Sequence, residues 1–146
     1  MVIDTEYDIN PKRMLALSYL ICQNNIILEK IRYVKYSPEV FRVDENGEAF
    51  KYHNLTNKFL DKEGESINTI MDDFEKDLEG IDMIIGQNII SADINIIRKE
   101  SIGTLNWYDS LRDKLKKIPI YDTMVSFREK NPGEKSSLDS IYKFLF

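Results

Sequence analysis

Two apolar runs separated by three polar residues constrain the fold of this chain more than any other stretch. Residues 14–22 (MLALSYLIC) and 26–36 (IILEKIRYVKY) have the apolar, β-branched and aromatic composition of strands. Between them, QNN supplies Asn24 and Asn25, which tolerate the positive φ angles of a tight hairpin turn. The pattern predicts an antiparallel hairpin, and residues 1–5 read as a further short buried strand.

After this beginning, helical and strand patterns alternate. Residues 66–80 place apolar side chains at helical spacing, with Ser66 as the N-cap and Gly80 just past the end. The patterns then predict strands over 81–86 and 118–123 and helices over 91–100, 107–118 and 136–146, whereas 37–65 reads as irregular. We therefore expect an α/β fold with a central mixed sheet, antiparallel N-terminal strands and helices on both faces.

Length and composition indicate one globular domain spanning residues 1–146. Apolar residues make up 42% of the chain and charged residues 31%, and no apolar run reaches membrane-spanning length. No secretory signal pattern is present, so a cytoplasmic or intracellular protein is expected. The net charge of −5 disfavours broad electrostatic capture of nucleic acid, unless bound metal ions supply positive charge locally. Cys22 is expected to be a small buried apolar side chain.

Two carboxylates follow the apolar start of the chain in the stretch VIDTEYD. In a strand, Asp4 and Glu6 project from the same face and Thr5 from the other. Adjacent carboxylates repel and raise each other's pKa unless a cation neutralises them, and oxygen-only ligands favour Mg²⁺ or Mn²⁺. The alternative interpretation is a solvated strand end.

A third acid lies at a break between a strand and a helix. The predicted strand ends at Gly86, and the next helix begins near Ser91 with Asp93 in its first turn. Breaks of this kind often carry the sites of α/β folds. The alternative is that Ser91 or Asp93 only caps the helix.

Together these stretches resemble the DEDD superfamily of 3′-to-5′ exonucleases, in the proofreading-type (DEDDh) branch on a ribonuclease H-like fold. VIDTEYD resembles the first motif, an apolar strand that ends Asp-Thr-Glu, and KYHNLTNKFL resembles the His-Gly-Ile-Thr segment with Asn54 in place of Gly. GQNIISADINII resembles the second motif, with Gln87 in place of its His and Ala92 in place of its Phe. IPIYDTMVSF and SSLDSIYKFLF resemble the segments that precede the third motif, so the resemblance covers nearly the whole chain.

The resemblance implies a hydrolase that removes nucleotides from a single-stranded or frayed 3′ end of DNA or RNA, with two Mg²⁺ or Mn²⁺ ions in a complete site. A polymerase is a further candidate partner. Asp4, Glu6 and Asp93 would be the catalytic, metal-binding acids. The residues expected to line the substrate site or hold its loops are Thr5, Tyr7, His53, Thr56, Gln87 and Asn88. Asp122 is expected to cap the following helix, and Asp139 to lie on a solvated helix face.

The third motif of this family, His-x4-Asp or Tyr-x3-Asp, does not occur in these 146 residues. The only histidine, His53, is followed five positions later by Lys58, and no tyrosine has Asp four residues after it. Three interpretations stay open: an exonuclease domain truncated at its C-terminus, a degenerate exonuclease fold that binds nucleic acid or a polymerase without cutting, and an unrelated α/β domain. The first, which we favour, predicts weak or absent activity for this chain.

Overall fold

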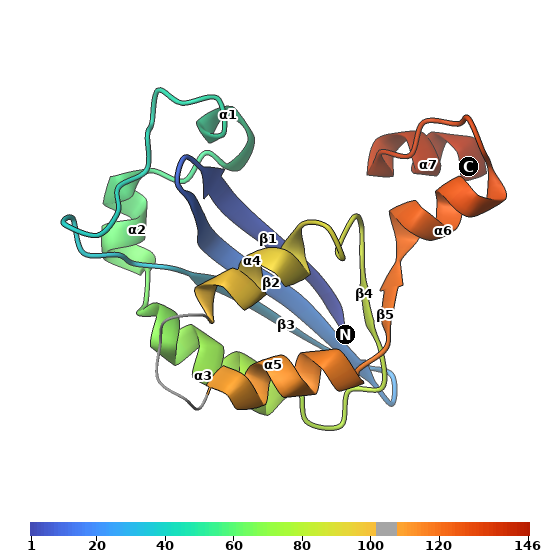
Figure 1. The fold of residues 1–146 in the computed structure, drawn as a ribbon, viewed down its shortest axis with the longest axis horizontal. Helices are drawn as coiled ribbons and strands as arrows, with labels where there is room; N and C mark the ends of the chain where they lie inside the picture. The colour runs from blue at the N-terminus through green and yellow to red at the C-terminus, as the bar shows by residue number, and fades with distance from the viewer. Residues whose placement is uncertain (102–107) are drawn as a thin grey trace.

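The computed structural model describes residues 1–101 and 108–146. Along the chain the elements are β1 (Val2–Ile9), β2 (Lys12–Gln23), β3 (Ile26–Tyr33), α1 (Phe50–His53), α2 (Asn57–Glu63), α3 (Ile67–Asp77), β4 (Ile84–Gly86), α4 (Asp93–Glu100), α5 (Tyr108–Lys117), β5 (Ile120–Asp122), α6 (Thr123–Lys130) and α7 (Leu138–Leu145) (Figure 1). The expected first residue of the α5 helix, 107, lies outside the described residues.

The strands form a five-stranded mixed sheet in the order β3-β2-β1-β4-β5. Antiparallel pairing joins β1 to β2 and β2 to β3, and parallel pairing joins β1 to β4 and β4 to β5. Asn24 and Asn25 take φ angles of 50° and 65° in the β2–β3 turn, as the sequence predicts. The expected mixed sheet with antiparallel N-terminal strands is confirmed.

Strand β1, which forms a hairpin with β2, is longer than the sequence indicates. β1 continues to Ile9 and pairs with β2 from Lys12 onward, with a bulge between Glu6 and Tyr7. Polar residues flank the turn between β1 and β2, so apolar alternation alone does not predict that the strand extends this far. Asp4 and Glu6 therefore lie inside a strand and not at its end.

Two short helices occupy part of the segment that was expected to be irregular. α1 has four residues and α2 has seven, too few for an apolar period to be recognised. Asn54 ends α1 with a φ of 54°, as the left-handed position in the resemblance requires.

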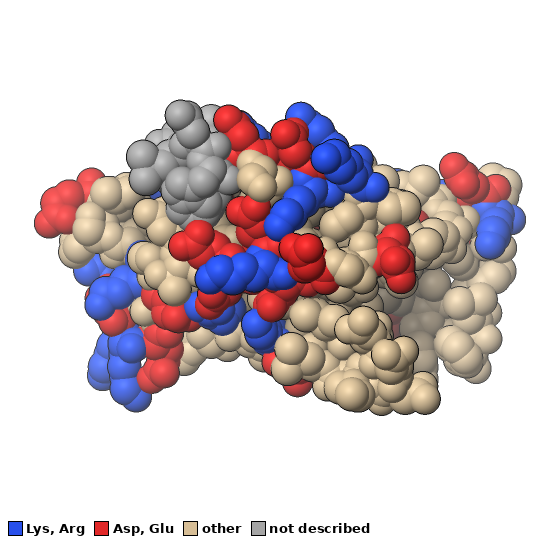
Figure 2. Space-filling model, turned by 90° about the horizontal axis from the view of Figure 1, so that it is seen from below, with Lys and Arg blue, Asp and Glu red and all other residues tan. Residues whose placement is uncertain are grey.

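Helices α3, α4 and α5 cover one face of the sheet (Figure 1). Phe74 of α3 packs edge-on against Tyr19 of β2, with ring centroids 5.3 Å apart. Thr5 of β1 bonds to α4 on that same face, and α5 joins α3 through the Lys114–Glu75 ion pair at 3.6 Å. On the outer side of α3 and α5, acidic and basic side chains are interspersed (Figure 2).

The opposite face of β1, β2 and β3 is exposed, and no described helix covers it as a second layer. Its side chains, here called the open face, are Val2, Asp4, Ser18, Leu20, Ile27, Glu29 and Ile31. Cys22 pairs in register with Ile27 and is exposed, so the expectation of a buried Cys22 is wrong. Its apolar run continues past the part of β2 that the helices cover.

The remaining helices, α6 and α7, lie beyond β5 (Figure 1). Asp122 caps α6 by accepting the backbone N–H groups of Met124 and Val125 at 3.0 and 3.3 Å, and Asp139 is exposed on α7, both as expected. No helix within the described ranges is long and apolar enough to cross a membrane.

Replacement of Phe74 tests the packing of α3 on the sheet. Phe74 is fully buried, so we expect Phe74→Ala to lower the free energy of unfolding by about 3–5 kcal/mol, measured by urea denaturation. The exposed Tyr52 is the control, because Tyr52→Ala should change it by no more than about 0.5 kcal/mol. A loss below about 1 kcal/mol for Phe74→Ala would contradict this packing.

Candidate active site

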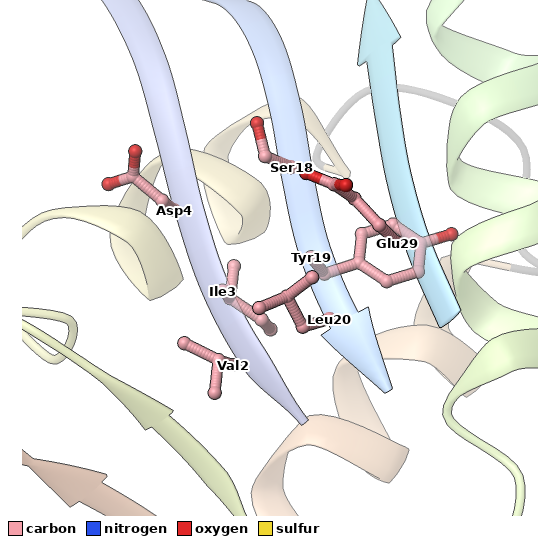
Figure 3. Close-up of a pocket in the computed structure, with 7 residues that line it drawn as sticks. All are labelled: Val2, Ile3, Asp4, Ser18, Tyr19, Leu20 and Glu29. Carbon is pink, nitrogen blue, oxygen red and sulfur yellow. The ribbon is translucent and has the colours of Figure 1, made fainter. Parts of the chain in front are cut away.

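Asp4 and Glu6 lie on one face of β1, as expected. In the β1–β2 ladder they stand opposite Ser18 and Ala16, on the same side of the bulge. Figure 3 shows the Asp4 carboxylate projecting from β1 on the side away from β2 and Ser18. Thr5 is buried on the other face, among the helices.

Asp93 reaches β1 from the start of α4. Its Oδ1 accepts the backbone N–H of Thr5 at 2.7 Å and the Thr5 hydroxyl at 2.6 Å. β4 pairs with β1 only near Val2 and ends at Gly86, so the Thr5 N–H has no β4 residue beside it. The carboxylate therefore takes the position of a hydrogen-bonding strand at this edge. Neither Ser91 nor Asp93 is the N-cap residue of α4. That residue is Ala92, and it makes no side-chain hydrogen bond to the helix.

The three carboxylates interact electrostatically. Desolvation by burial raises the pKa of Asp4, and it also raises the pKa of Glu6, with further increases from the charges of Asp4 and Asp93. Burial raises the pKa of Asp93 as well; the Thr5 hydrogen bonds oppose this and the charge of Asp4 adds to it. Each acid is thus less ready to ionise than an isolated one.

The chemistry of this donor set fits a hard divalent cation, because all its donors are carboxylate oxygens and they repel one another. One Asp93 oxygen is engaged by Thr5. Within residues 1–101 and 108–146, no three His, Cys, Asp or Glu side chains converge as a metal-ligand set. The acids are therefore near enough to influence each other's pKa without meeting at one point.

A hollow of about 460 Å³ opens beside Glu6 and contains two of the predicted substrate residues. Its lining residues are Glu6, Tyr7, Ile9, Glu48, Ala49, Tyr52 and His53. Lys12 Nζ lies over the Tyr7 ring, 4.7 Å from its centroid. The structure brings Tyr7 and His53 together with Glu6 around this hollow.

His53 is held in one tautomer. Its Nδ1 accepts the Leu55 N–H at 3.0 Å, and burial lowers its pKa, although the nearby charge of Asp8 raises it. The neutral ring then carries its proton on Nε2, which has no partner among the described residues. The Nε2–H of His53 is therefore a buried donor without a partner among the described residues.

Asp8 is a candidate site residue that the sequence reading missed. It is buried, with Oδ1 accepting the Ile9 N–H at 2.7 Å and Oδ2 without a partner in the described part of the chain. The signal was the third acid of VIDTEYD. Apolar alternation ends the predicted strand at residue 5, whereas β1 continues to Ile9 and its bulge changes which residues face inward.

The loop between β4 and α4 is tied to the β5–α6 connection. Asp122 accepts the backbone N–H groups of Asn88 and Ile90 at 3.0 and 3.2 Å. Gln87 donates to the Ser136 carbonyl at 2.8 Å and accepts the Thr123 hydroxyl. Gln87 and the Asn88 backbone thus hold the loop that leads to Asp93.

Thr56 lies apart from this group. Its hydroxyl caps α2 by accepting the Phe59 N–H at 3.1 Å. This position is consistent with a role in holding the α1–α2 loop.

Comparison with known proteins gives likenesses in structure. No family model and no curated protein matches the sequence. The product-bound structure of exonuclease I matches with a TM-score of 0.69 at 13% identity, over 95% of this chain and 34% of that chain. The zinc-bound complex of E. coli exonuclease I with single-stranded DNA gives 0.68 and 12%, over 94% and 31%. Exonuclease X in complex with 5′-overhanging duplex DNA gives 0.56 and 17%, over 99% and 71%.

The chain spans about a third of the length of the exonuclease I chains. At these identities the likeness concerns the fold, and it agrees with the sheet order and helix positions described above. The chain has the ribonuclease H-like fold that these exonucleases share.

Proposed function

We propose that this chain is a nuclease domain that hydrolyses phosphodiester bonds at a nucleic-acid 3′ end with Mg²⁺ or Mn²⁺. One observation carries the proposal: Asp93, 88 residues from Thr5 in sequence, is bonded to the strand that bears Asp4 and Glu6. Carboxylates whose pKa values are raised by burial and by each other's charge mark a candidate functional site.

In this proposal Asp4, Glu6 and Asp93 hold the divalent ions. Bound ions would neutralise phosphate charge and favour attack by water on phosphorus. The side chains contribute negative charge at fixed positions, and Thr5 keeps Asp93 oriented through two hydrogen bonds. The like charges would then be balanced, which lowers the cost of ionising them together.

The hollow beside Glu6 would receive the terminal nucleotide. Tyr7 and Tyr52 offer aromatic surface to a base, and His53 lies in the wall of the hollow. Exonuclease I and exonuclease X have been solved with single-stranded DNA and overhanging duplex DNA, which supports a nucleic-acid substrate.

Two observations favour slow hydrolysis, or binding without hydrolysis, as the second candidate function. No third motif occurs in these 146 residues. Gln87, at the position of the second-motif His, is committed to Thr123 and Ser136. A positioned general base usually contributes about 10²–10⁴-fold to a rate, so hydrolysis by this chain should be weak.

Activity is tested with a 5′-labelled single-stranded oligonucleotide in Mn²⁺ or Mg²⁺. We expect slow, metal-dependent shortening from the 3′ end, and a loss of about a hundredfold or more in Asp4→Asn, because a charge that acts on the reacting phosphate is removed. The matched control is Asp139→Asn on exposed α7, which should leave the rate unchanged.

Binding of the same strand in EDTA separates the two candidate functions. Binding of the strand in EDTA, with no shortening when metal is present, would favour a fold that binds nucleic acid without cutting it. Absence of both binding and shortening would contradict the proposal. Equal rates for the wild type and Asp4→Asn would exclude Asp4 from the chemistry.

The Thr5 hydroxyl is tested by Thr5→Val, with Thr5→Ser as the control that keeps it. Loss of the hydroxyl leaves buried Asp93 with one donor fewer. We expect urea denaturation to give a free energy of unfolding lower by about 1–3 kcal/mol for Thr5→Val, and a smaller loss for Thr5→Ser. Equal losses in the two variants would show that the methyl packing, not the hydrogen bond, matters.

Burial of Glu6, together with the charges of Asp4 and Asp93, predicts a pH-dependent gain in stability for Glu6→Gln. The folded-state pKa of Glu6 lies above its ordinary value of 4.5, so the folded protein loses stability as pH rises from about there through the raised pKa. Glu6→Gln should be more stable than the wild type at pH 7 by up to about 0.5 kcal/mol, a value reduced by solvent screening. The difference should vanish near pH 4, as urea denaturation at both pH values can measure. Exposed Glu134→Gln is the control, and a destabilised Glu6→Gln at pH 7 would contradict the raised pKa of Glu6.

A further inference from the structure

Two lysines meet at the turn between β1 and β2. Lys12 begins β2, pairs in register with Ile9, and holds its ammonium group 4.7 Å from the centroid of the Tyr7 ring. Lys99, in the last turn of α4, donates from Nζ to the Lys12 carbonyl at 2.5 Å. The fold thus brings two positive charges, 87 residues apart in sequence, to the hollow beside Glu6, which Tyr7 and Ile9 help to line.

Neither lysine has an acidic partner among the described residues. The neighbouring Arg13 does, because it forms an ion pair with Glu100 at 3.4 Å and stands opposite Asp8 in the β1–β2 ladder. Within the described ranges, Lys12 Nζ makes no hydrogen bond, and Lys99 Nζ makes only its bond to the carbonyl. An ammonium group has three N–H donors, so most of the donors of this pair are free to bind a ligand.

A purely structural role does not account for both charges. A lysine in the last turn of a helix commonly interacts with the last carbonyls of that helix, whereas Lys99 bonds to β2. The contact of Lys12 with the Tyr7 ring is a weak attraction at a partly exposed site, and it uses no N–H donor. Two cations brought to one turn are better accommodated when an anion binds there.

The order of features along β1 indicates which part of a substrate the lysines would meet. The acids Asp4 and Glu6 come first. The hollow extends from Glu6 along Tyr7 and Ile9, and Lys12 follows across the turn. In the proposed function, on which this inference rests, the acids act on the phosphate that joins the last nucleotide to its neighbour, and the last nucleotide fills the hollow. The opposite end of that nucleotide, its 3′ group, therefore lies toward Lys12.

We propose that Lys12 and Lys99 bind a phosphate at the 3′ end of the strand, so that this domain accepts strands that end in a 3′-phosphate. A 3′-hydroxyl is neutral, whereas a phosphate monoester brings nearly two negative charges and three acceptor oxygens to the two ammonium groups. Glu48 also lines the hollow, but it is exposed and belongs to the wall that residues 48–53 form, beside the end of β1 (Figure 1). Strand scission that leaves the phosphate on the 3′ side must supply such ends.

Hydrolysis of such an end follows the same reaction and gives a different product. Water attacks the phosphorus of the last internucleotide phosphodiester, and the bond from that phosphorus to the 3′ oxygen of the penultimate nucleotide breaks. That oxygen leaves with a proton. The products are a nucleoside 3′,5′-bisphosphate and a strand shorter by one nucleotide, which now ends in a 3′-hydroxyl.

Binding in EDTA tests the lysines without hydrolysis. Two 5′-labelled single-stranded oligonucleotides of one sequence, with a 3′-phosphate or a 3′-hydroxyl, are titrated with the protein and followed by fluorescence anisotropy. We expect the wild type to bind the phosphate end about tenfold or more tightly, because the hydrogen bonds are charge-assisted. Lys12→Gln and Lys99→Gln should each lower the ratio of the two dissociation constants, and the double variant should bring it close to one. Lys12→Arg, which keeps the charge, should retain the preference.

Lys117→Gln is the matched control, because it removes the same charge at the other end of the sheet. Lys117 is exposed and ends α5 just before β5, and β5 joins the sheet through β4 near the Val2 end of β1. The ratio should stay as in the wild type, and circular dichroism establishes that each variant is folded. Equal weakening of both strands by Lys12→Gln would place Lys12 on an internal phosphate and overturn the proposal. A wild-type ratio near one would overturn it as well.

Mass spectrometry after incubation with Mn²⁺ separates this inference from the proposed function. From the 3′-phosphate strand we expect the nucleoside bisphosphate and the shortened strand. Shortening of the 3′-hydroxyl strand alone, with the 3′-phosphate strand left intact, would overturn the inference and leave the proposed function standing. Shortening of neither strand, with the phosphate end still bound more tightly in EDTA, would overturn the proposed hydrolysis and support recognition of the 3′ end by the two lysines.

Discussion

The hydrogen bonds from Thr5 to Asp93 determine how the two halves of this chain meet. β4 is too short to pair with β1 beyond its first residues, so β1 would leave the Thr5 N–H unpaired at a buried edge. The Asp93 carboxylate satisfies that group and the Thr5 hydroxyl together. Because Asp93 begins α4, this contact fixes the start of α4 on the sheet and, with it, the loop from Gly86.

The same contact imposes an electrostatic cost. A buried carboxylate that accepts two hydrogen bonds is stabilised as an anion, yet burial and the Asp4 charge act in the opposite direction on its pKa. Glu6 receives the charges of both other acids. Purely structural packing would replace one of these acids with a neutral residue, since the Thr5 N–H needs only an acceptor. The presence of all three acids is consistent with a site that meets a cation.

Sequence patterns predicted the features that depend on contacts between residues close together in the sequence. The Asn-Asn turn, the Ser66 cap of α3 and the Asp122 cap of α6 each depend on residues a few positions apart. The extent of β1 depended on pairing with β2, and the exposure of Cys22 depended on which part of β2 the helices cover. The role of Asp93 required a partner 88 residues away, which capping statistics do not contain. Sequence order supplied the candidate acids, and only tertiary structure could show which hydrogen bonds hold them.

Alternation along β1 places its side chains on two opposite faces of the sheet. Ile3 and Thr5 face the helices, whereas Val2, Asp4 and Glu6 face away from them. Asp4 therefore belongs both to the acidic group near Asp93 and to a hollow of about 220 Å³ on the open face. An apolar surface packed closely over Asp4 would desolvate its carboxylate and raise its pKa further, unless a positive charge arrived with it. Any partner that covers the open face must consequently either bring a cation near Asp4 or leave that carboxylate in contact with water.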